Sequence, residues 1–493
     1  MLVLLLHLLL ALAYASLTPL GEAPDEPAHL RYAQFIARQG RLPQTLAERT
    51  AAGYRSTWPP LYHLLLTGPL EAVGDTPPTR LKAVGDSPRR LIPTNGQTIA
   101  AFIHTDDEAW PWRGLPLAWH LGRIISTVLS TLALIPTYLI AWRLTRRRSL
   151  GLSATALQAT IPQVLFVGSV LNDDNLLILL AGIILLILVL YTQAATAPGL
   201  GRLFLLGLLL GLAVVTKYNA LPLWALAFVW VAWLRYRAPV QTHRTGPVAH
   251  VVSGLAVLLI GAVISSGWWF GFIWRHFNQI DRQGLWAGSL ATVAAGTADA
   301  TLRQIDTGLS ITWPTLAQWL EWFVTFFKSF WGLFGGGSTI ELPAWSYWLL
   351  ALFCLLAAIP YLKTLIARSS PRFILQPSAL IPLLLTPLFF LPLPLLRFLL
   401  SGSIVETAQG RHLFPALPAI TLALIWGLHC FSQTALRSPL SAPRFILPTA
   451  LILLTTLLSL YSLPLIRASY PPPIPLRTTA DAVSVESPLQ ARL

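Results

Sequence analysis

The sequence predicts an all-α protein that crosses a membrane many times. Of its 493 residues, 55% are hydrophobic and only 11% are charged, whereas soluble domains carry about 25% charged residues. Apolar runs long enough to cross a bilayer recur along the chain, with basic residues clustered in the short gaps between them. We therefore expect a polytopic transmembrane helical bundle of about 11–13 spans, with external loops that carry short interfacial helices.

The predicted spans follow from the apolar runs in chain order. They are 2–18, 117–142, 150–170, 173–192, 203–217, 219–235, 249–273, 344–366, 374–398, 412–432 and 445–466. The first run could be a signal peptide, because Ala13-Tyr14-Ala15 resembles a cleavage site. The usual positively charged start is missing, however, so we expect an uncleaved span. The run 201–235 predicts either two short spans with a tight turn or one broken helix.

The stretch 318–334 differs from these spans. It is rich in Trp and Phe, and Gly335-Gly336-Gly337 follows it. Aromatic residues are enriched where a membrane meets water. We interpret this stretch as an interfacial helix that does not cross the membrane.

The basic clusters predict the orientation. Arg143 and the run 146–148 form one strong cluster, and counting spans onward places the clusters within 235–244, 363–372 and 437–444 on the same side. Short basic loops face the cytoplasm, so we expect a multi-pass plasma-membrane protein with a cytoplasmic N-terminus. This placement also accounts for the formal charge of +14. Because nucleic-acid motifs are absent, we expect no nucleic-acid partner.

The same count divides the chain into a membrane module, 1–466, and a Pro-rich external tail, 467–493. It places the loops 19–116, 275–343 and 399–411 outside the cytoplasm. Most internal loops are short. The work of the protein is therefore expected at the outer leaflet.

The acidic motif Pro24-Asp25-Glu26-Pro27-Ala28-His29 follows the first span directly. Charge beside lipid is costly and predicts function. Pro27 suits the first turn of a helix that Gly40 can end, which makes Asp25 or Glu26 a plausible cap. His29 lies one helical turn after Asp25. Capping explains one acid but not two acids and a histidine, so we predict catalytic roles for Asp25 and Glu26. Asp25, Glu26 and His29 are also an incomplete set of ligands for a divalent cation such as Mg²⁺ or Mn²⁺, which nothing in the sequence requires.

Two further acidic residues, Asp173 and Asp174, stand in Asn172-Asp173-Asp174-Asn175 between two spans. They can anchor a metal or orient a polar substrate, or simply form a polar turn. Three basic residues, Arg123, Lys217 and Arg411, are expected on the external side and suit a lipid phosphate. Snorkelling toward ordinary headgroups is the alternative. Phosphate binding is favoured for Arg411, because Glu406, Gln409 and a glycine accompany it.

A rigid element, Pro59-Pro60-Leu61-Tyr62, stands in the first external loop and leads into the apolar stretch 61–73. Tyr62 and this stretch could line a substrate groove or dip into the membrane interface. The acidic segment 104–108 in the same loop is interpreted as solvated.

Taken together, these motifs resemble the GT-C superfamily of membrane glycosyltransferases, and most closely its protein O-mannosyltransferase-like branch and a neighbouring family of uncharacterised bacterial membrane proteins. The resemblance rests on 24–29, 59–62, 172–174, Thr216-Lys217-Tyr218-Asn219 and Gln409-Gly410-Arg411-His412-Leu413-Phe414-Pro415. It implies a helical fold of GT-C type and inverting sugar transfer from a polyprenyl-phosphate donor in the outer leaflet. It also implies that Asp25 acts as base or orients the acceptor.

That chemistry agrees with the residues. A glycosyl phosphate already carries a good leaving group, so the reaction needs a carboxylate to take the acceptor's proton and positive charge on the phosphate. Asp25 suits the first role, and Arg411 with Lys217 or Arg123 the second; Glu26 and His29 could orient Asp25. The expected partners are a polyprenyl-phosphate-linked sugar, a glycan, lipid or protein acceptor, and membrane lipids. The alternatives are a membrane transporter or flippase, or a non-catalytic subunit of lipid-linked glycan assembly.

Overall fold

The chain folds into a bundle of helices in a computed structural model that describes residues 1–74, 104, 108–194, 196–237, 246–277, 313–335, 340–366, 377–435 and 445–470. The tail after Tyr470, most of the loop 275–343, residues 105–107 of the acidic segment and the basic residues Arg244, Arg368, Arg372, Arg437 and Arg444 lie outside these ranges.

The helices, in chain order, are α1 (Leu2–Leu17), α2 (Glu26–Gln39), α3 (Leu46–Ala52), η1 (Tyr54–Thr57), α4 (Leu61–Val73), α5 (Gly114–Leu132), α6 (Leu134–Thr145), α7 (Arg148–Thr160), α8 (Pro162–Gly168), α9 (Asp174–Gln193), α10 (Leu200–Thr216), η3 (Tyr218–Ala220), α11 (Leu221–Tyr236), α12 (Pro247–Phe277), α16 (Leu316–Trp331), α17 (Ala344–Ile366), α18 (Pro377–Phe390), α19 (Pro392–Ser401), α20 (Ile404–Thr407), η5 (Gly410–Ala416), α21 (Leu417–Ala435) and α22 (Ile446–Ser469). Two short strands in the described part, β1 (Leu333–Phe334) and β2 (Ile340–Glu341), pair antiparallel, with Leu333 opposite Glu341.

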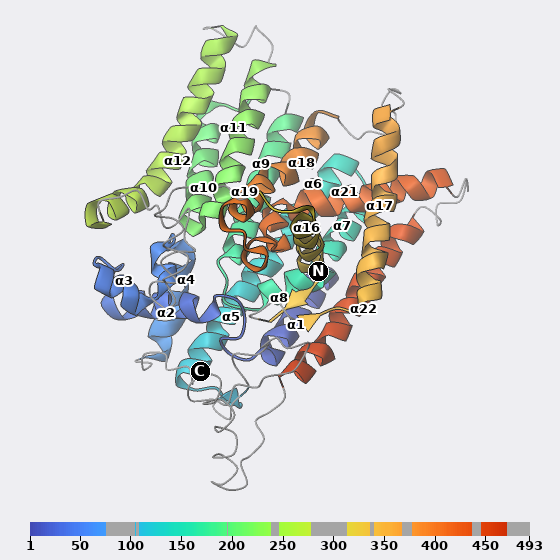
Figure 1. Cartoon of the computed structure of the whole chain (residues 1–493). Coiled ribbons are helices and arrows are strands. Elements are labelled where there is room, and N and C mark those ends of the chain that lie inside the picture. Colours follow the sequence, from blue (N-terminus) through green and yellow to red (C-terminus); the bar gives the residue numbers. More distant parts are fainter. Residues whose placement is uncertain are drawn as a thin grey trace.

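The helices fall into neighbouring groups (Figure 1). Helices α10, α11 and α12 lie side by side, α2, α3 and α4 form a second group beneath them, and α17, α21 and α22 pack together on the other side of the bundle. The interfacial helix expected at 318–334 is α16. It packs across η5 and α20.

The protein is a multi-pass membrane protein. Seven helices in the described part are long and apolar enough to cross a membrane: Gly114–Thr145, Asp174–Gln193, Pro247–Phe277, Ala344–Thr364, Pro382–Ser401, Ile404–Gln433 and Ile446–Ser469. The predicted spans 2–18, 203–217 and 219–235 form the shorter helices α1, α10 and α11. The helical architecture predicted from the sequence is therefore confirmed.

The predicted span 150–170 is broken in the middle. Helices α7 and α8 meet at an angle of 65°. Pro162 lacks an N–H, and Ile161 before it adopts an extended conformation (φ −66°, ψ 120°). Other helices satisfy the carbonyls next to the break, because His7 Nδ1 donates to Ala159 (2.9 Å) and Ser459 Oγ donates to Thr160 (2.7 Å). The bend aims α8 toward the segment that holds Asp173.

The run 201–235 makes two helices joined by a tight turn. Helix α10 ends at Thr216, η3 makes the turn, and α11 folds back so that Trp224 Nε1 donates to the carbonyl of Leu210 (2.8 Å). Lys217 therefore stands at the end of α10, where the carbonyl end of a helix favours a cation.

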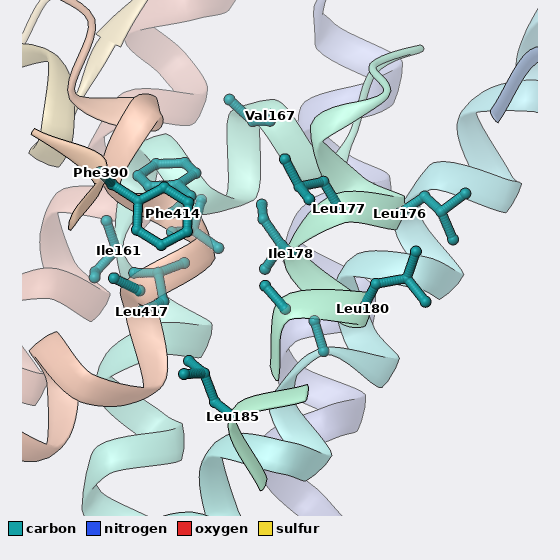
Figure 2. Packing of buried hydrophobic residues seen from close by; sticks show 14 of the residues in the cluster. Ile161, Val167, Leu176, Leu177, Ile178, Leu180, Leu185, Phe390, Phe414 and Leu417 are labelled. Carbon is teal, nitrogen blue, oxygen red and sulfur yellow. The ribbon is translucent and has the colours of Figure 1, made fainter. Parts of the chain in front are cut away.

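The buried core surrounds α9. Figure 2 shows Leu177 and Ile178 of α9 in one apolar cluster with Ile161, Phe414 and Leu417. These side chains fix the start of α9 against η5. They thereby place Asp173, which precedes α9, near Arg411, which lies in η5.

Candidate functional site

Asp25 occupies the position just before α2 in a left-handed conformation (φ 67°). Aspartate tolerates this region better than most residues, but it still costs about 1 kcal/mol or more. The Asp25 carbonyl accepts the amides of Ala28 and His29, whereas its side chain makes no capping hydrogen bond. The carboxylate instead accepts a hydrogen bond from Tyr54 Oη and pairs with the Arg55 guanidinium. Capping therefore does not account for this carboxylate.

Arg411 approaches the same carboxylate from η5. Its Nη2 lies 3.5 Å from Asp25 Oδ2, and its Nε donates to Gln409 Oε1 (2.8 Å). The side chains of Asp25 and Arg411 stay 24% and 13% exposed, respectively, so a ligand can reach both. The structure thus brings together the acidic motif after the first helix and the basic motif before α21.

Arg55, which the sequence reasoning did not single out, links this pair to a second acidic cluster. It is buried, and its Nη1 lies 3.8 Å from Asp173 Oδ2. The Trp58 ring lies beneath its guanidinium, with 4.5 Å between Cζ and the ring centroid. Asp173 accepts from Lys217 Nζ (2.7 Å), which also contacts Asp174 (2.8 Å). A continuous chain of charges therefore runs from Arg411 to Asp174.

The charges set the protonation states of the two acids outside the spans. Burial alone would raise the pKa of Asp25, but the charges of Arg55 and Arg411 and the bond from Tyr54 lower it well below its usual range. Burial likewise opposes ionisation of Asp173, and Lys217 and Arg55 outweigh it, so its pKa is also lowered. Both groups are carboxylates at neutral pH.

Phosphate binding by Lys217 would require its ammonium group to be accessible and unpaired, and it is neither. It is buried, and both its carboxylate partners, Asp173 and Asp174, are buried with it. The structure therefore corrects its predicted role: the Lys217 ammonium lies between the two carboxylates at the start of α9, and Arg55 supplies a second positive charge next to Asp173. Asp173 and Asp174 do not form an open metal site either, because the Lys217 ammonium already contacts one oxygen of each carboxylate.

Glu26 and Arg123 form a separate, fully buried ion pair. Arg123 Nε and Nη2 donate to the two Glu26 oxygens (2.8 and 2.7 Å), and its remaining donors reach the carbonyls of Ala15, Thr18 and Pro19. Glu26 also accepts the amides of Gly21 and Leu171. These contacts use all five donors of Arg123. The pair therefore fastens the first loop to α5, which corrects the predicted catalytic role of Glu26 and phosphate-binding role of Arg123.

His29 stacks on His63, with 2.9 Å between its Nδ1 and Nε2 of His63. Burial lowers the pKa of both rings, that of His63 to about 3. Because Asp25, Glu26 and His29 point to different partners, they do not fit a divalent cation. Among the residues that the structure describes, no three His, Cys, Asp or Glu side chains gather as metal ligands.

Tyr62 is fully buried. Its hydroxyl contacts Ser126 Oγ (2.6 Å) and accepts the amide of Asn172 (3.0 Å). This corrects the expectation that Tyr62 lines a substrate groove. The residue instead fixes the turn that carries Asp173.

A pocket lies next to Arg411 and to Pro24, the residue before Asp25. The polar residues Gln163, Asn172 and Gln409 and the apolar residues Phe166, Val167 and Val170 contribute to its lining. Glu406 is exposed at the edge of this region, and Arg397 of α19 interacts electrostatically with Glu406, Arg411, Arg55 and Asp25. The Arg411 guanidinium in the lining suits an anionic group of a ligand, and Phe166, Val167 and Val170 suit an apolar part of the same ligand.

Two residues of the site were not singled out from the sequence, and one of them left a clear signal there. Arg397 is the only charge in the predicted span 374–398, and such a residue is a functional candidate by default. Arg55 directly precedes the Ser56-Thr57-Trp58-Pro59-Pro60 element, but nothing local to it predicts that it is buried.

Comparison with known proteins returns solved structures alone. Two structures of ArnT from Cupriavidus metallidurans, one bound to undecaprenyl phosphate and one in the apo state, align with 86% of this chain and 76% of theirs, at 14% identity and TM-scores of 0.33 and 0.34. No family model matches the sequence, and no curated protein matches it.

Proposed function

We propose that the protein is an integral-membrane glycosyltransferase of GT-C type, which moves a sugar from a polyprenyl-phosphate donor to an acceptor at the extracytoplasmic face. The observation that carries the proposal is the meeting of Asp25 with Arg411 beside a pocket. A carboxylate that can take a proton and a guanidinium that can bind a phosphate are the two groups that transfer from a glycosyl phosphate requires.

The proposed reaction is a displacement at the anomeric carbon. The acceptor hydroxyl oxygen forms the new bond, and its proton passes to the Asp25 carboxylate. The bond between the anomeric carbon and the phosphate oxygen breaks, and the phosphate leaves with the electron pair. Attack opposite the leaving group inverts the anomeric centre. Arg411, with Arg397 nearby, stabilises the charge that develops on the phosphate.

The position of the charges favours this reaction over transport. Asp25 precedes α2, Asp173 precedes α9, Lys217 follows α10 and Arg411 lies in η5. A proton- or ion-driven transporter is expected to carry ionisable groups deep within its spans. Here these four groups lie at helix ends and connecting turns, and Arg397 is the member of the network that lies within a candidate span. A glycan, lipid or protein hydroxyl could serve as the acceptor.

A deletion strain tests the proposal. Lipid extracts of the deletion strain and of the strain complemented with the wild-type gene are compared by mass spectrometry. We expect a polyprenyl-phosphate-linked sugar to accumulate in the deletion strain and to return to its normal level on complementation. Identical pools of lipid-linked sugars in the two strains would contradict donor consumption by this protein.

A further inference from the structure

Arg55 is a buried guanidinium with most of its donors unused. Its Nη2 pairs with Asp25, but neither Nε nor Nη1 has a hydrogen-bond partner, although both are buried. Arg123 in the same protein uses all five donors. An unfilled buried donor typically costs about 1–3 kcal/mol. The unused side of Arg55 is therefore a place where a ligand with several acceptor oxygens would be stabilised.

Asp25, which pairs with Arg55, is surrounded by too much positive charge to act as a base in this arrangement. Asp25 faces Arg55 and Tyr54 from η1, Arg411 from η5, and the neutral His29 from α2, with Arg397 of α19 further away. These groups hold the pKa of Asp25 well below its usual range. A carboxylate of that kind is ionised but accepts a proton poorly. At least one cation must move away before Asp25 can take a proton efficiently.

The surroundings allow Arg55 to be the cation that moves. Its guanidinium rests on the Trp58 ring and lies 5.5 Å from the centroid of the Tyr54 ring, and aromatic faces attract a cation without fixing its direction. Its second anionic neighbour, Asp173, stays at 3.8 Å, beyond hydrogen-bond distance, and accepts a hydrogen bond from Lys217 on its other oxygen. The pocket that Arg411 lines includes Pro24, the residue before Asp25.

We propose that Arg55 is a positioning residue that exchanges partners: it holds Asp25 in the free protein and turns to the phosphate of the bound lipid donor, which releases the carboxylate for the acceptor's proton. This inference rests on the proposed function. The exchange makes base activation depend on the donor, so the acceptor is not deprotonated before a phosphate is in place.

The protonation of Asp25 tests the exchange. Carbodiimides modify protonated carboxyl groups, and Asp25 is 24% exposed. Full-length protein in detergent is labelled from pH 4 to pH 8, and modification at Asp25 is located by mass spectrometry. The probes are undecaprenyl phosphate and, as the control, undecaprenol, which lacks the phosphate. Buried Glu26 and exposed Glu341 serve as internal references.

We expect undecaprenyl phosphate, but not undecaprenol, to increase the rate of Asp25 modification at pH 4 by about 10–1,000-fold, because one nearby opposite charge shifts a pKa by about 1–3 units. Arg55→Gln should show the faster rate without lipid and no further increase with it. Arg55→Lys keeps the charge and should retain part of the response.

A separate binding measurement distinguishes failure of the partner exchange from failure of the proposed function. Binding of radiolabelled undecaprenyl phosphate is measured on the same samples. If the lipid binds and the rate of Asp25 modification at pH 4 does not change, the exchange is wrong while the proposed function stands. If the lipid does not bind, both fail. A wild-type rate of Asp25 modification in folded Arg55→Gln would also overturn the exchange.

Discussion

The guanidinium of Arg411 lies 3.5 Å from the carboxylate of Asp25, although the two residues stand near opposite ends of the chain. Helix α16 fixes this relationship from one side, because Ser329 Oγ donates to the carbonyl of Ala408 and accepts the amide of Gly410. The apolar contacts between α9 and η5 fix it from the other. The site therefore depends on the tertiary fold more than on any single motif.

Removal of the Arg411 guanidinium should impair transfer more than folding. Arg411→Ala removes the guanidinium that we expect to bind the leaving phosphate. Loss of one hydrogen-bond donor to the transition state typically lowers the reaction rate by about 10²–10³-fold. Arg411→Lys should recover part of the activity, because it keeps the charge but loses the planar fork. Transfer rates at equal protein amounts check this. Arg411→Ala with wild-type kcat/KM would contradict phosphate binding by this residue.

Gly410 should tolerate no side chain. A Cβ at this position would overlap the backbone of Phe330 in α16, so Gly410→Ala must displace η5 and Arg411 with it. A misplacement of about 1 Å can cost about 10²-fold in rate. Gly271→Ala is the matched control, because a Cβ there meets no atom within 4 Å. We expect transfer to fall in Gly410→Ala only; equal activity of the two variants would contradict the close packing of η5 on α16.

Glu26→Gln should destabilise the fold. The substitution leaves Arg123 buried with an uncompensated charge, which typically costs about 3–5 kcal/mol. Thermal unfolding in detergent measures the effect. Glu341→Gln, which removes the exposed partner of Lys328, should leave the midpoint nearly unchanged. If Glu26→Gln unfolds at the wild-type temperature but loses transfer, Glu26 is catalytic after all.

Stability should fall as the pH drops below neutral, partly because of His63. Burial lowers the folded-state pKa of His63 from 6.5 to about 3. Between pH 6.5 and pH 3 the unfolded chain binds a proton at His63 that the folded chain does not. His63 therefore lowers the free energy of unfolding by up to about 1.4 kcal/mol for each pH unit of acidification in that range. His63→Asn should flatten the dependence of the unfolding midpoint between pH 6.5 and 4. An unchanged slope would contradict a neutral buried His63.

The sequence predicts much of this fold because lipid constrains it strongly. Apolar length locates helices such as Asp174–Gln193 and Ile446–Ser469, and Gly40 ends α2 in the expected left-handed conformation (φ 62°). The break at Pro162 was not predicted, although the proline is visible. A proline breaks a helix more readily where other groups can bind the carbonyls that lose their helical partners. Here His7 and Ser459 bind those carbonyls, and both residues come from helices that are distant in the sequence.

The candidate site was predictable in outline but not in its pairing. The sequence places Asp25 and Glu26 side by side at the start of a helix, and the structure pairs them with different cations, Arg55 and Arg123. Which cation each would meet depends on tertiary contacts. Arg123 and Lys217 became partners of buried carboxylates, and Arg55 entered the site from a short helix that has no periodic pattern.

The most direct test of the account is the transfer activity of Asp25→Asn, measured in membranes of the deletion strain by the loss of the accumulated lipid-linked sugar. Glu341→Gln, expressed to the same level, is the control. We expect Asp25→Asn to lower transfer by about 10²–10⁴-fold, the usual contribution of a general base, while Glu341→Gln stays at the wild-type rate. Equal consumption of the donor by the two variants would contradict the central role of Asp25.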